Sequence, residues 1–241
     1  MIPKVIHYCW FGSSKKPDYF HLCKKSWIKY FPEFEIMEWN ESNTDLSHPF
    51  IKKAIQEEKW AFASDYVRLA KLYEYGGIYL DTDMLFIKPF DSGLLKYTHF
   101  IGMENSQSLS AGIIGAEPLN FYLKDLLTFY DNLKFSSFEK NLIPNVLNSV
   151  YLNYSNTRIQ QGDFKGGLIL PYWVFYPLPL KLKEFHWKQF LRVDSRAVHL
   201  WAGSWMKYSK VSISHSLLKK LKYFISQYYV PRSFLAYARS I

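Results

Sequence analysis

Short apolar runs and helix-spaced apolar positions follow one another along the first forty residues. The run over 4–10 is mostly apolar and ends at Gly12, which predicts a buried strand. Pro17 suits the first turn of a helix, and apolar residues at helical spacing continue to Phe31, which predicts an amphipathic helix packed on that strand. A partly alternating run over 34–39 predicts a second strand. This strand–helix–strand opening is typical of an α/β sandwich with a parallel sheet.

The same patterns continue through the rest of the chain. The pair Gly76-Gly77 ends a predicted helix over 61–75 and turns the chain into a short apolar strand over 78–80. The segment over 168–190 is rich in Pro, Tyr and Trp, and we expect it to be irregular. The other predicted elements are helices over 49–58, 119–132 and 138–150, extended segments over 84–87, 100–104, 110–116 and 197–201, and a helical tail over 214–229.

Composition bounds the class of protein. Of the 241 residues, 49% are apolar and 19% aromatic, so a large core is available and a disordered chain is excluded. No run approaches the roughly 18 apolar residues of a membrane-spanning helix, and the first residues lack the pattern of a signal peptide. We therefore expect a protein made and kept in the cytosol. Cys9 and Cys23 form neither a disulfide framework nor a metal-ligand pattern, and we expect two reduced, partly buried thiols.

The net charge of +9 is unevenly distributed. Residues 1–180 carry 18 Lys and Arg against 19 Asp and Glu, whereas residues 181–241 carry 12 against 2. We expect a catalytic domain over 1–206 and a basic, aromatic helical tail over 207–241. Two accounts of this tail stay open: a helix docked on the body, or a peripheral attachment to an anionic membrane surface.

Asp81 and Asp83 follow the predicted strand over 78–80, and ligands of open α/β sheets bind at the carboxyl ends of strands. In extended backbone the side chains at i and i+2 point to the same side, so we expect both carboxylates to converge. Two such oxygen ligands, completed by water and phosphate, suit Mg²⁺ or Mn²⁺. Because ten Asp give roughly 0.4 chance matches to this spacing, a solvated acidic turn is the alternative for the pair taken alone.

Asp65 and Arg68 lie three residues apart on a predicted helix and therefore share one face. One interpretation is an exposed ion pair that contributes roughly a few tenths of a kcal/mol. The rest of the helix is mostly apolar, which indicates burial. Burial favours the other interpretation, a charged pair directed into a site, where it binds sugar hydroxyls and phosphate.

A late cluster combines His199 and Trp201 with Ser204 and Trp205. It fits the packed end of a core. It also fits a lid, in which indole rings cover a ligand, Ser204 and an indole N–H donate to phosphate, and His199 binds metal or phosphate.

The order of these blocks closely resembles glycosyltransferase family 32. The blocks are Ile2–His7 with Trp10–Gly12, Ser26-Trp27, Ala63–Arg68, Leu72–Asp83 and His199–Trp205. The family comprises DXD-containing sugar transferases, among them bacterial capsule and lipopolysaccharide enzymes and yeast Golgi mannosyltransferases, with glucosylating clostridial toxins as more distant relatives. The resemblance covers residues 2–116 well and returns at 197–205. The region over 117–196 carries no such motif, and we expect it to shape the acceptor pocket.

The resemblance implies a GT-A-type fold, a Rossmann-like nucleotide-sugar-binding sandwich with a mixed central sheet, here followed by the helical tail. It implies a retaining, metal-dependent hexosyltransferase that moves a hexose or N-acetylhexosamine from a nucleotide sugar to a saccharide or lipid-linked saccharide. The cation is Mn²⁺ or Mg²⁺, and analogy with bacterial relatives favours a UDP-sugar. The implied setting is bacterial capsule, O-antigen or lipopolysaccharide synthesis. The sequence itself predicts a cytoplasmic protein, and the membrane account of the tail would place it on the inner face of the plasma membrane.

The resemblance also implies roles for individual residues. Asp83 is similar to the direct metal ligand, and Asp81 to a partner that touches the metal through water and contacts ribose or sugar. Asp65 and Arg68 resemble the donor-sugar contacts, and together these four form the expected catalytic set. The expected donor-binding set is Trp10, Ser64, Asp65, Arg68, Asp81, Thr82, Ser204 and Trp205, and the expected metal-binding set is Asp81, Asp83, His199 and Ser204.

Within these sets Trp10 resembles the aromatic residue that stacks on the base, and Ser204 and Trp205 resemble closing-loop groups on the metal and the β-phosphate. No residue must act as a nucleophile, so we expect front-face attack by the acceptor hydroxyl, with the departing phosphate taking its proton. Asp65 stays a candidate electrostatic stabiliser.

Two other classes stay open. A metal-dependent phosphohydrolase would use the same two aspartates, although such sites usually need more ligands and often a second metal. A nucleic-acid-binding protein is suggested by the pI of about 9.3. Because the excess charge is confined to the tail and no binding motif occurs, we expect no nucleic-acid partner.

Overall fold

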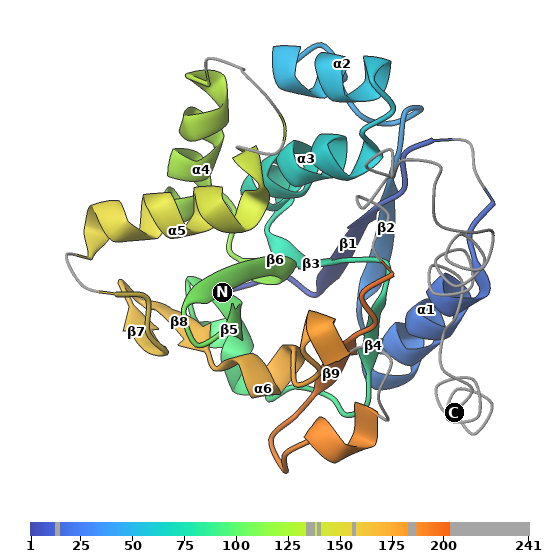
Figure 1. Ribbon diagram of the computed structural model, residues 1–241, viewed down its shortest axis with the longest axis vertical. Helices are drawn as coiled ribbons and strands as arrows, with labels where there is room; N and C mark the ends of the chain where they lie inside the picture. The colour runs from blue at the N-terminus through green and yellow to red at the C-terminus, as the bar shows by residue number, and fades with distance from the viewer. Residues whose placement is uncertain (13–14, 134–137, 139–140, 156–157, 183–186, 203–241) are drawn as a thin grey trace, which may run out of the picture.

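A mixed seven-stranded sheet forms the centre of the molecule in a computed structural model, which describes residues 1–12, 15–133, 138, 141–155, 158–182 and 187–202 (Figure 1). The strand order is β2-β1-β3-β6-β5-β8-β7. The strands are β1 (Val5–Cys9), β2 (Glu35–Trp39), β3 (Gly77–Leu80), β5 (His99–Asn105), β6 (Ser108–Ala116), β7 (Gly162–Phe164) and β8 (Gly167–Leu170). A separate two-stranded sheet pairs β4 (Met84–Phe86) with β9 (Ala197–His199).

The strand directions bring several carboxyl ends to one edge of the sheet. Strand β1 is parallel to both β2 and β3, as the opening pattern predicts. Strand β6 runs antiparallel to β3 and β5, so β5 has the same direction as β3, and β8 is parallel to β5. The mixed sheet confirms the expected α/β architecture. The carboxyl ends of β1, β3, β5 and β8 therefore lie along one edge.

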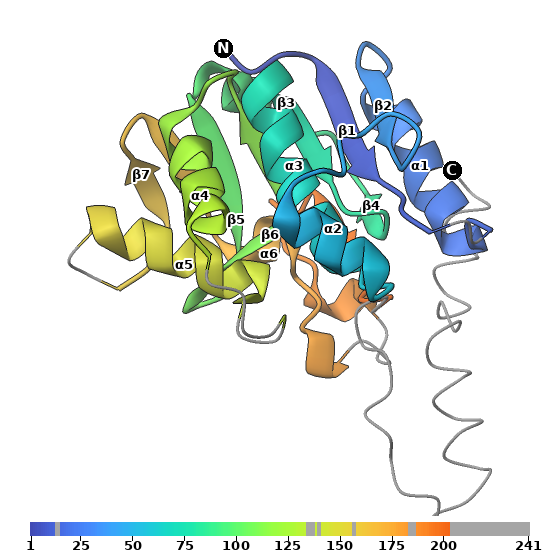
Figure 2. The same ribbon diagram turned by 90° about the horizontal axis from the view of Figure 1, so that it is seen from above.

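Helices cover both faces of the sheet (Figures 1 and 2). Helices α2 to α5 pack on one face, and α1, α6 and the β4–β9 ladder pack on the other. The α-helices are α1 (Asp18–Tyr30), α2 (Pro49–Gln56), α3 (Trp60–Tyr75), α4 (Phe121–Asp131), α5 (Ile143–Tyr154) and α6 (Tyr172–Phe175), and 3₁₀ turns cover Ser92–Lys96, Leu180–Leu182 and Trp187–Phe190.

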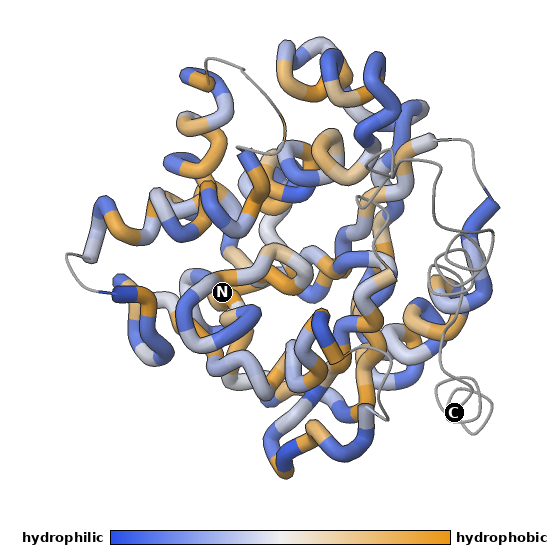
Figure 3. Tube along the Cα trace, in the orientation of Figure 1, coloured by the Kyte–Doolittle hydropathy of each residue, from blue (hydrophilic) through white to orange (hydrophobic). Residues whose placement is uncertain are grey.

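The two layers bury two hydrophobic clusters, one on each face of the sheet. Neighbouring strand residues contribute to opposite clusters, as the pleat requires: Tyr79 packs under α3, whereas Ile78 and Leu80 pack toward α1 and β4. Apolar and polar stretches alternate along the helices, consistent with one buried face each (Figure 3). Among the described helices, none has the length and apolar character that crossing a bilayer requires.

The Gly76-Gly77 break connects α3 to β3 under tight constraints. Both glycines have positive φ, and a Cβ on Gly77 would lie 2.6 Å from the carbonyl oxygen of Val5. The indole N–H of Trp39 donates to Nδ1 of His7 at 3.1 Å, so the ring proton is on Nε2 and donates to the Gly76 carbonyl at 2.8 Å. Burial lowers the pKa of His7, in keeping with a neutral ring. Strand β1 and the end of α3 thus fix the position at which β3 begins.

Three predicted elements need correction. The helix expected over 138–150 begins at Ile143, because Pro144 lacks an N–H and fits only the first turn. The segment expected to be irregular over 168–190 contains most of β8, paired with β5, and the short α6. The strand expected over 197–201 ends at His199. The tail helix over 214–229 and the domain boundary at 207 lie outside the described residues.

His99 at the start of β5 is a buried imidazole away from the acidic cluster, and its ring occupies the space above Gly167, where a Cβ would come within 2.3 Å. Burial lowers the pKa of His99 to about 4. The folded state therefore binds fewer protons than the unfolded state between about pH 4 and 6.5, and stability is lost as pH falls through that window. Wild type should lose about 3 kcal/mol relative to His99→Gln between pH 7 and 4.

Urea unfolding of both proteins at several pH values measures this difference, in which the other titrating groups cancel. A pH-independent gap between wild type and His99→Gln would contradict the assignment of a neutral, buried imidazole.

Candidate active site

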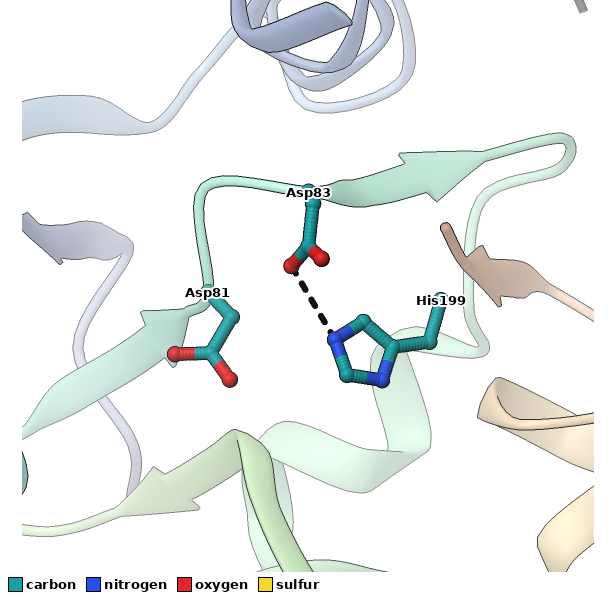
Figure 4. Close-up of side chains that lie close together, drawn as sticks. All are labelled: Asp81, Asp83 and His199. Atoms are coloured by element: carbon teal, nitrogen blue, oxygen red, sulfur yellow. Dashed lines mark hydrogen bonds and ion pairs between the residues drawn. The ribbon is translucent and has the colours of Figure 1, made fainter. Parts of the chain in front are cut away.

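Three side chains from separate segments converge at the carboxyl edge of the sheet (Figure 4). Asp81 follows the last residue of β3, Asp83 immediately precedes β4, and His199 ends β9 directly opposite Met84. One ligand atom of each lies within 4.8 Å of the others. Two carboxylates and an imidazole therefore face a common point.

The two aspartates converge through a turn rather than through extended backbone, which corrects the expectation from strand alternation. The N–H of Met84 donates to the carbonyl of Asp81 at 3.1 Å and closes the turn. The β4–β9 ladder then continues one step, because Leu200 N–H donates to the carbonyl of Asp83 at 3.0 Å. The ladder places His199 beside Asp83.

Asp83 and His199 form a buried, charge-assisted pair. Their Oδ1 and Nε2 atoms lie 3.0 Å apart, and the N–H of Ala202 donates to the other carboxylate oxygen at 2.9 Å. Burial disfavours both charges, yet the pKa of Asp83 is lowered by the imidazole and the backbone N–H, and the pKa of His199 is raised by the carboxylate. Trp201, which directly precedes Ala202, has a φ of 54°, and this unusual backbone turns the Ala202 N–H toward Asp83.

Arg68 is the hub of a second group beside the first. Its guanidinium contacts the Asp65 carboxylate at 2.8 Å and the Asp81 carboxylate at 3.1 Å, and it donates to the carbonyl of Ala111 at 2.9 Å. The ring of Tyr79 lies beneath it, 4.5 Å from Cζ. The pair Asp65–Arg68 is thus buried, and the exposed ion pair considered from the sequence is excluded.

The surroundings of Asp65 are unfavourable for a negative charge. Burial raises the pKa of Asp65 to about 7, and Asp81 adds to the rise, although Arg68 opposes it. Arg68 therefore shares its single positive charge between two carboxylates. A divalent cation beside Asp81 and Asp83 would relieve this excess of negative charge.

The donor set fits a divalent cation. Asp81 is the most exposed of the three ligand candidates, with 26% of its side chain accessible, so it can bind a solvated ion or a ligand. Nε2 of His199 lies 3.0 Å from Asp83 Oδ1 and faces the cluster, and it would give up its proton on binding an ion. Nδ1 is buried and has no hydrogen-bond partner among the described residues. Carboxylate oxygens with an imidazole nitrogen suit Mn²⁺ better than Mg²⁺, which takes oxygen ligands.

Supporting residues escaped the sequence patterns. The Tyr79 hydroxyl donates to Asp81 at 3.1 Å. Tyr176 lies beneath the cluster, with its hydroxyl accepting from Ile113 N–H at 2.8 Å and its ring centroid 5.8 Å from that of His199. A Cβ on Gly112 would lie 3.0 Å from the Tyr176 hydroxyl. Tyr176 comes from the segment expected to be irregular and carries no motif, so only the tertiary structure reveals it.

The cluster lies in the wall of a cleft of about 390 Å³. Most of the expected site residues share this cleft: Trp10, Ser64, Asp65, Arg68, Asp81, Thr82, Asp83 and His199. Ser204 and Trp205 lie outside the described residues. Trp10 follows β1 and lines the cleft together with Tyr19 and Trp60, and a Cβ on Gly12 would lie 2.9 Å from the Trp60 ring. Glu104 also lines the cleft and was not anticipated.

The fold agrees with that of a solved glycosyltransferase structure. A solved structure of the PaToxG glycosyltransferase superposes with a TM-score of 0.50 at 19% identity, covering 64% of this chain and 70% of that one. This likeness concerns the fold, and it confirms the GT-A type. The family model described as "Glycosyltransferase sugar-binding region containing DXD motif" matches residues 17–101.

Sequence relatives of the chain are named as sugar transferases. It is 29% identical over 119 residues to inositol phosphoceramide mannosyltransferase 3 of Schizosaccharomyces pombe, an alignment covering 47% of this chain and 33% of that protein. It is 26% identical over 155 residues to lactosylceramide 4-alpha-galactosyltransferase of Mus musculus, covering 57% and 40%. The chain thus spans well under half the length of these relatives. Residues 17–101 thus match the model of the DXD-containing family, and the relatives carry the names of sugar transferases, in line with the expected class.

Proposed function

We propose that this protein is a metal-dependent, retaining glycosyltransferase that moves a hexose or N-acetylhexosamine from a UDP-sugar to a saccharide acceptor. The observation that carries the proposal is the convergence of Asp81, Asp83 and His199 within 4.8 Å, in the cleft that also contains the Asp65–Arg68 pair. Separation of a sugar from a diphosphate needs positive charge where negative charge develops. This site gathers the groups that would supply it.

Asp81, Asp83 and His199 would hold the cation, with Mn²⁺ favoured over Mg²⁺ because one ligand is an imidazole. With a cation held there, the charge of the leaving diphosphate would be offset by roughly several kcal/mol. Ala202 N–H and the β4–β9 ladder keep the Asp83 carboxylate oriented, so little reorganisation is needed when the donor binds.

Arg68 would act next to the linkage that breaks. Its contacts with Asp65, Asp81 and the Ala111 carbonyl fix the guanidinium in one orientation before any ligand enters. Asp65 is engaged by Arg68, which argues for a role in orienting and stabilising charge rather than as a nucleophile. Front-face attack by the acceptor hydroxyl, with its proton passing to the departing phosphate oxygen, accounts for retention without a covalent intermediate.

The biological setting is proposed on coarser grounds. Bacterial capsule, O-antigen or lipopolysaccharide synthesis would supply a saccharide or lipid-linked acceptor. A cytoplasmic enzyme whose basic tail over 207–241 meets the anionic inner face of the plasma membrane would suit that acceptor. Removal of residues 210–241 should then reduce binding to vesicles that contain anionic lipid, and unchanged vesicle binding would refute the attachment.

A panel of UDP- and GDP-sugars tests the donor and the cation together. One UDP-sugar with Mn²⁺ should raise the melting temperature by several degrees, with a smaller rise for Mg²⁺ and none in excess EDTA. Chromatography of the products then shows whether the sugar appears on an added saccharide or only as free sugar. Release of sugar 1-phosphate with nucleoside monophosphate, at a rate indifferent to acceptor, would favour the phosphohydrolase alternative.

A further inference from the structure

Glu104 is a carboxylate in the cleft that neither the metal cluster nor the Arg68 group explains. It lies one residue before the end of β5, is half-buried and lines the cleft. No hydrogen bond or salt bridge to its carboxylate occurs within the part of the chain that the structure describes. Burial raises the pKa of Glu104, and the charge of His199 opposes that rise. A half-buried carboxylate without a fixed partner is costly, so a ligand is its natural partner.

The sheet topology places Glu104 on the far side of the metal cluster from Trp10. The relevant order is β1-β3-β6-β5, and β1, β3 and β5 end at the same edge. Trp10 follows β1, Asp81 follows β3, and Glu104 lies two strands further on, roughly 10 Å from β3 at about 4.8 Å per strand. A nucleotide that stacks on Trp10 with its diphosphate at Asp81 would therefore leave the Glu104 end open.

The Glu104 end has a lining that suits a saccharide. The start of β6 contributes Ser108 and Ser110, and α5 contributes its first apolar turn around Ile143 and Pro144. Asn148 of α5 holds the β5–β6 turn in place, because its side chain accepts from Leu109 N–H at 3.0 Å and donates to the Ser108 hydroxyl at 3.1 Å. Hydroxyls, a carboxylate and apolar carbons together match the mixed surface of a sugar ring.

Charge decides which part of the reaction Glu104 serves. A carboxylate repels the diphosphate of the donor, so it acts against a nucleotide sugar bound in the reverse direction. Asp65 and Arg68 already occupy the position beside the proposed cation. A neutral sugar presents hydroxyl groups that donate to a carboxylate in charge-assisted hydrogen bonds.

We propose that Glu104 binds hydroxyl groups of the acceptor saccharide and makes the site select a neutral acceptor over an anionic one. This proposal rests on the proposed transferase function and adds to it the acceptor end of the cleft and the chemical class that this end admits. Hydroxyl donors on the acceptor ring satisfy the carboxylate, whereas an acidic sugar would place a second negative charge beside it.

The test compares wild type with Glu104→Gln, using methyl glycosides of glucose, galactose, mannose and N-acetylglucosamine as acceptors. In the presence of the best UDP-sugar and Mn²⁺, we expect the acceptor KM of Glu104→Gln to rise about 10- to 100-fold, the loss typical of a hydrogen bond to a charged group. The rise in melting temperature caused by UDP and Mn²⁺ should be the same in both proteins. The preference for the neutral glycoside over its uronic acid counterpart should shrink in the variant.

Glu57→Gln is the matched control, because Glu57 is an exposed helix-end residue of α2 paired with Lys53, and it should behave like wild type. An unchanged acceptor KM and an unchanged neutral-to-acidic preference in Glu104→Gln would overturn the assignment, as would a wild-type complex that binds none of the four glycosides in ligand-observed NMR. A wild type that gains no stability from UDP and Mn²⁺ would instead overturn the proposed function itself.

Discussion

Asp83→Ala is expected to reduce sugar transfer about a thousandfold or more while the protein keeps its fold. Asp83 is the carboxylate held by His199 at 3.0 Å and by the Ala202 N–H at 2.9 Å, so its removal takes away an oriented ligand of the proposed cation. A thousandfold loss corresponds to about 4 kcal/mol of leaving-group stabilisation, within the range that a bound cation supplies.

Transfer is measured with the best donor of the nucleotide-sugar panel, and circular dichroism follows the fold. Asp18→Ala serves as the matched control, because Asp18 is an exposed aspartate in the first turn of α1 that does not line the cleft. Near-normal transfer by Asp83→Ala, or by wild type in excess EDTA, would rule out the metal-dependent mechanism.

The elements that the sequence predicted are those whose signals are local. Strand β1, helix α1 and strand β2 have apolar periods, a starting proline and ending glycines or prolines within a few residues of one another. Gly76-Gly77 marked the end of α3 because only a residue without a side chain fits that turn against Val5 and His7. The parallel opening of the sheet followed from that alternation of strand and helix.

The elements that escaped depend on distant partners. Strand β8 has four residues, and its identity as a strand comes from pairing with β5, some seventy residues earlier. Tyr176 supports the cluster only because Gly102 and Gly112 leave room for its ring on two neighbouring strands. Such a fit between separated positions leaves no periodic trace in the sequence.

The candidate site likewise contains residues that the sequence predicted and one that it did not. The residue types and the spacing of Asp81 and Asp83 pointed to a cation, and the structure brings them together with His199, although through a turn instead of an extended strand. The burial of Asp65 and Arg68 followed from their apolar helix. Glu104 lies in no recurring motif, and its place in the cleft depends on the order of the strands, which the sequence left undetermined.

Arg68→Met is expected to lower the free energy of unfolding by about 3–5 kcal/mol, the usual cost of leaving a buried charge without its partner. The Arg68 side chain is 6% exposed, and its guanidinium contacts both Asp65 and Asp81. Methionine keeps most of the apolar stem and removes the charge, so the loss measures unpaired carboxylates more than lost packing. Urea unfolding at pH 7 gives the value, and transfer should fall strongly as well because Arg68 faces the proposed leaving group.

The origin of this loss predicts a rescue and a pH dependence. Asp65→Asn added to Arg68→Met should restore about half of the lost stability, because it removes one of two unpaired carboxylates. If the two substitutions acted independently, the double variant would instead lose the sum of the two single losses. Burial already raises the pKa of Asp65 to about 7, and loss of Arg68, which lowers it, should raise that pKa further. The folded variant then binds more protons than the unfolded chain up to a higher pH, so the deficit of Arg68→Met against wild type should shrink as pH falls from 8 to 6. Two results together would contradict this account: a deficit of Arg68→Met that stays constant with pH, and a double variant as unstable as Arg68→Met alone. Arg68 would then support the fold by packing, and the shared-charge arrangement beside the cation site would be mistaken.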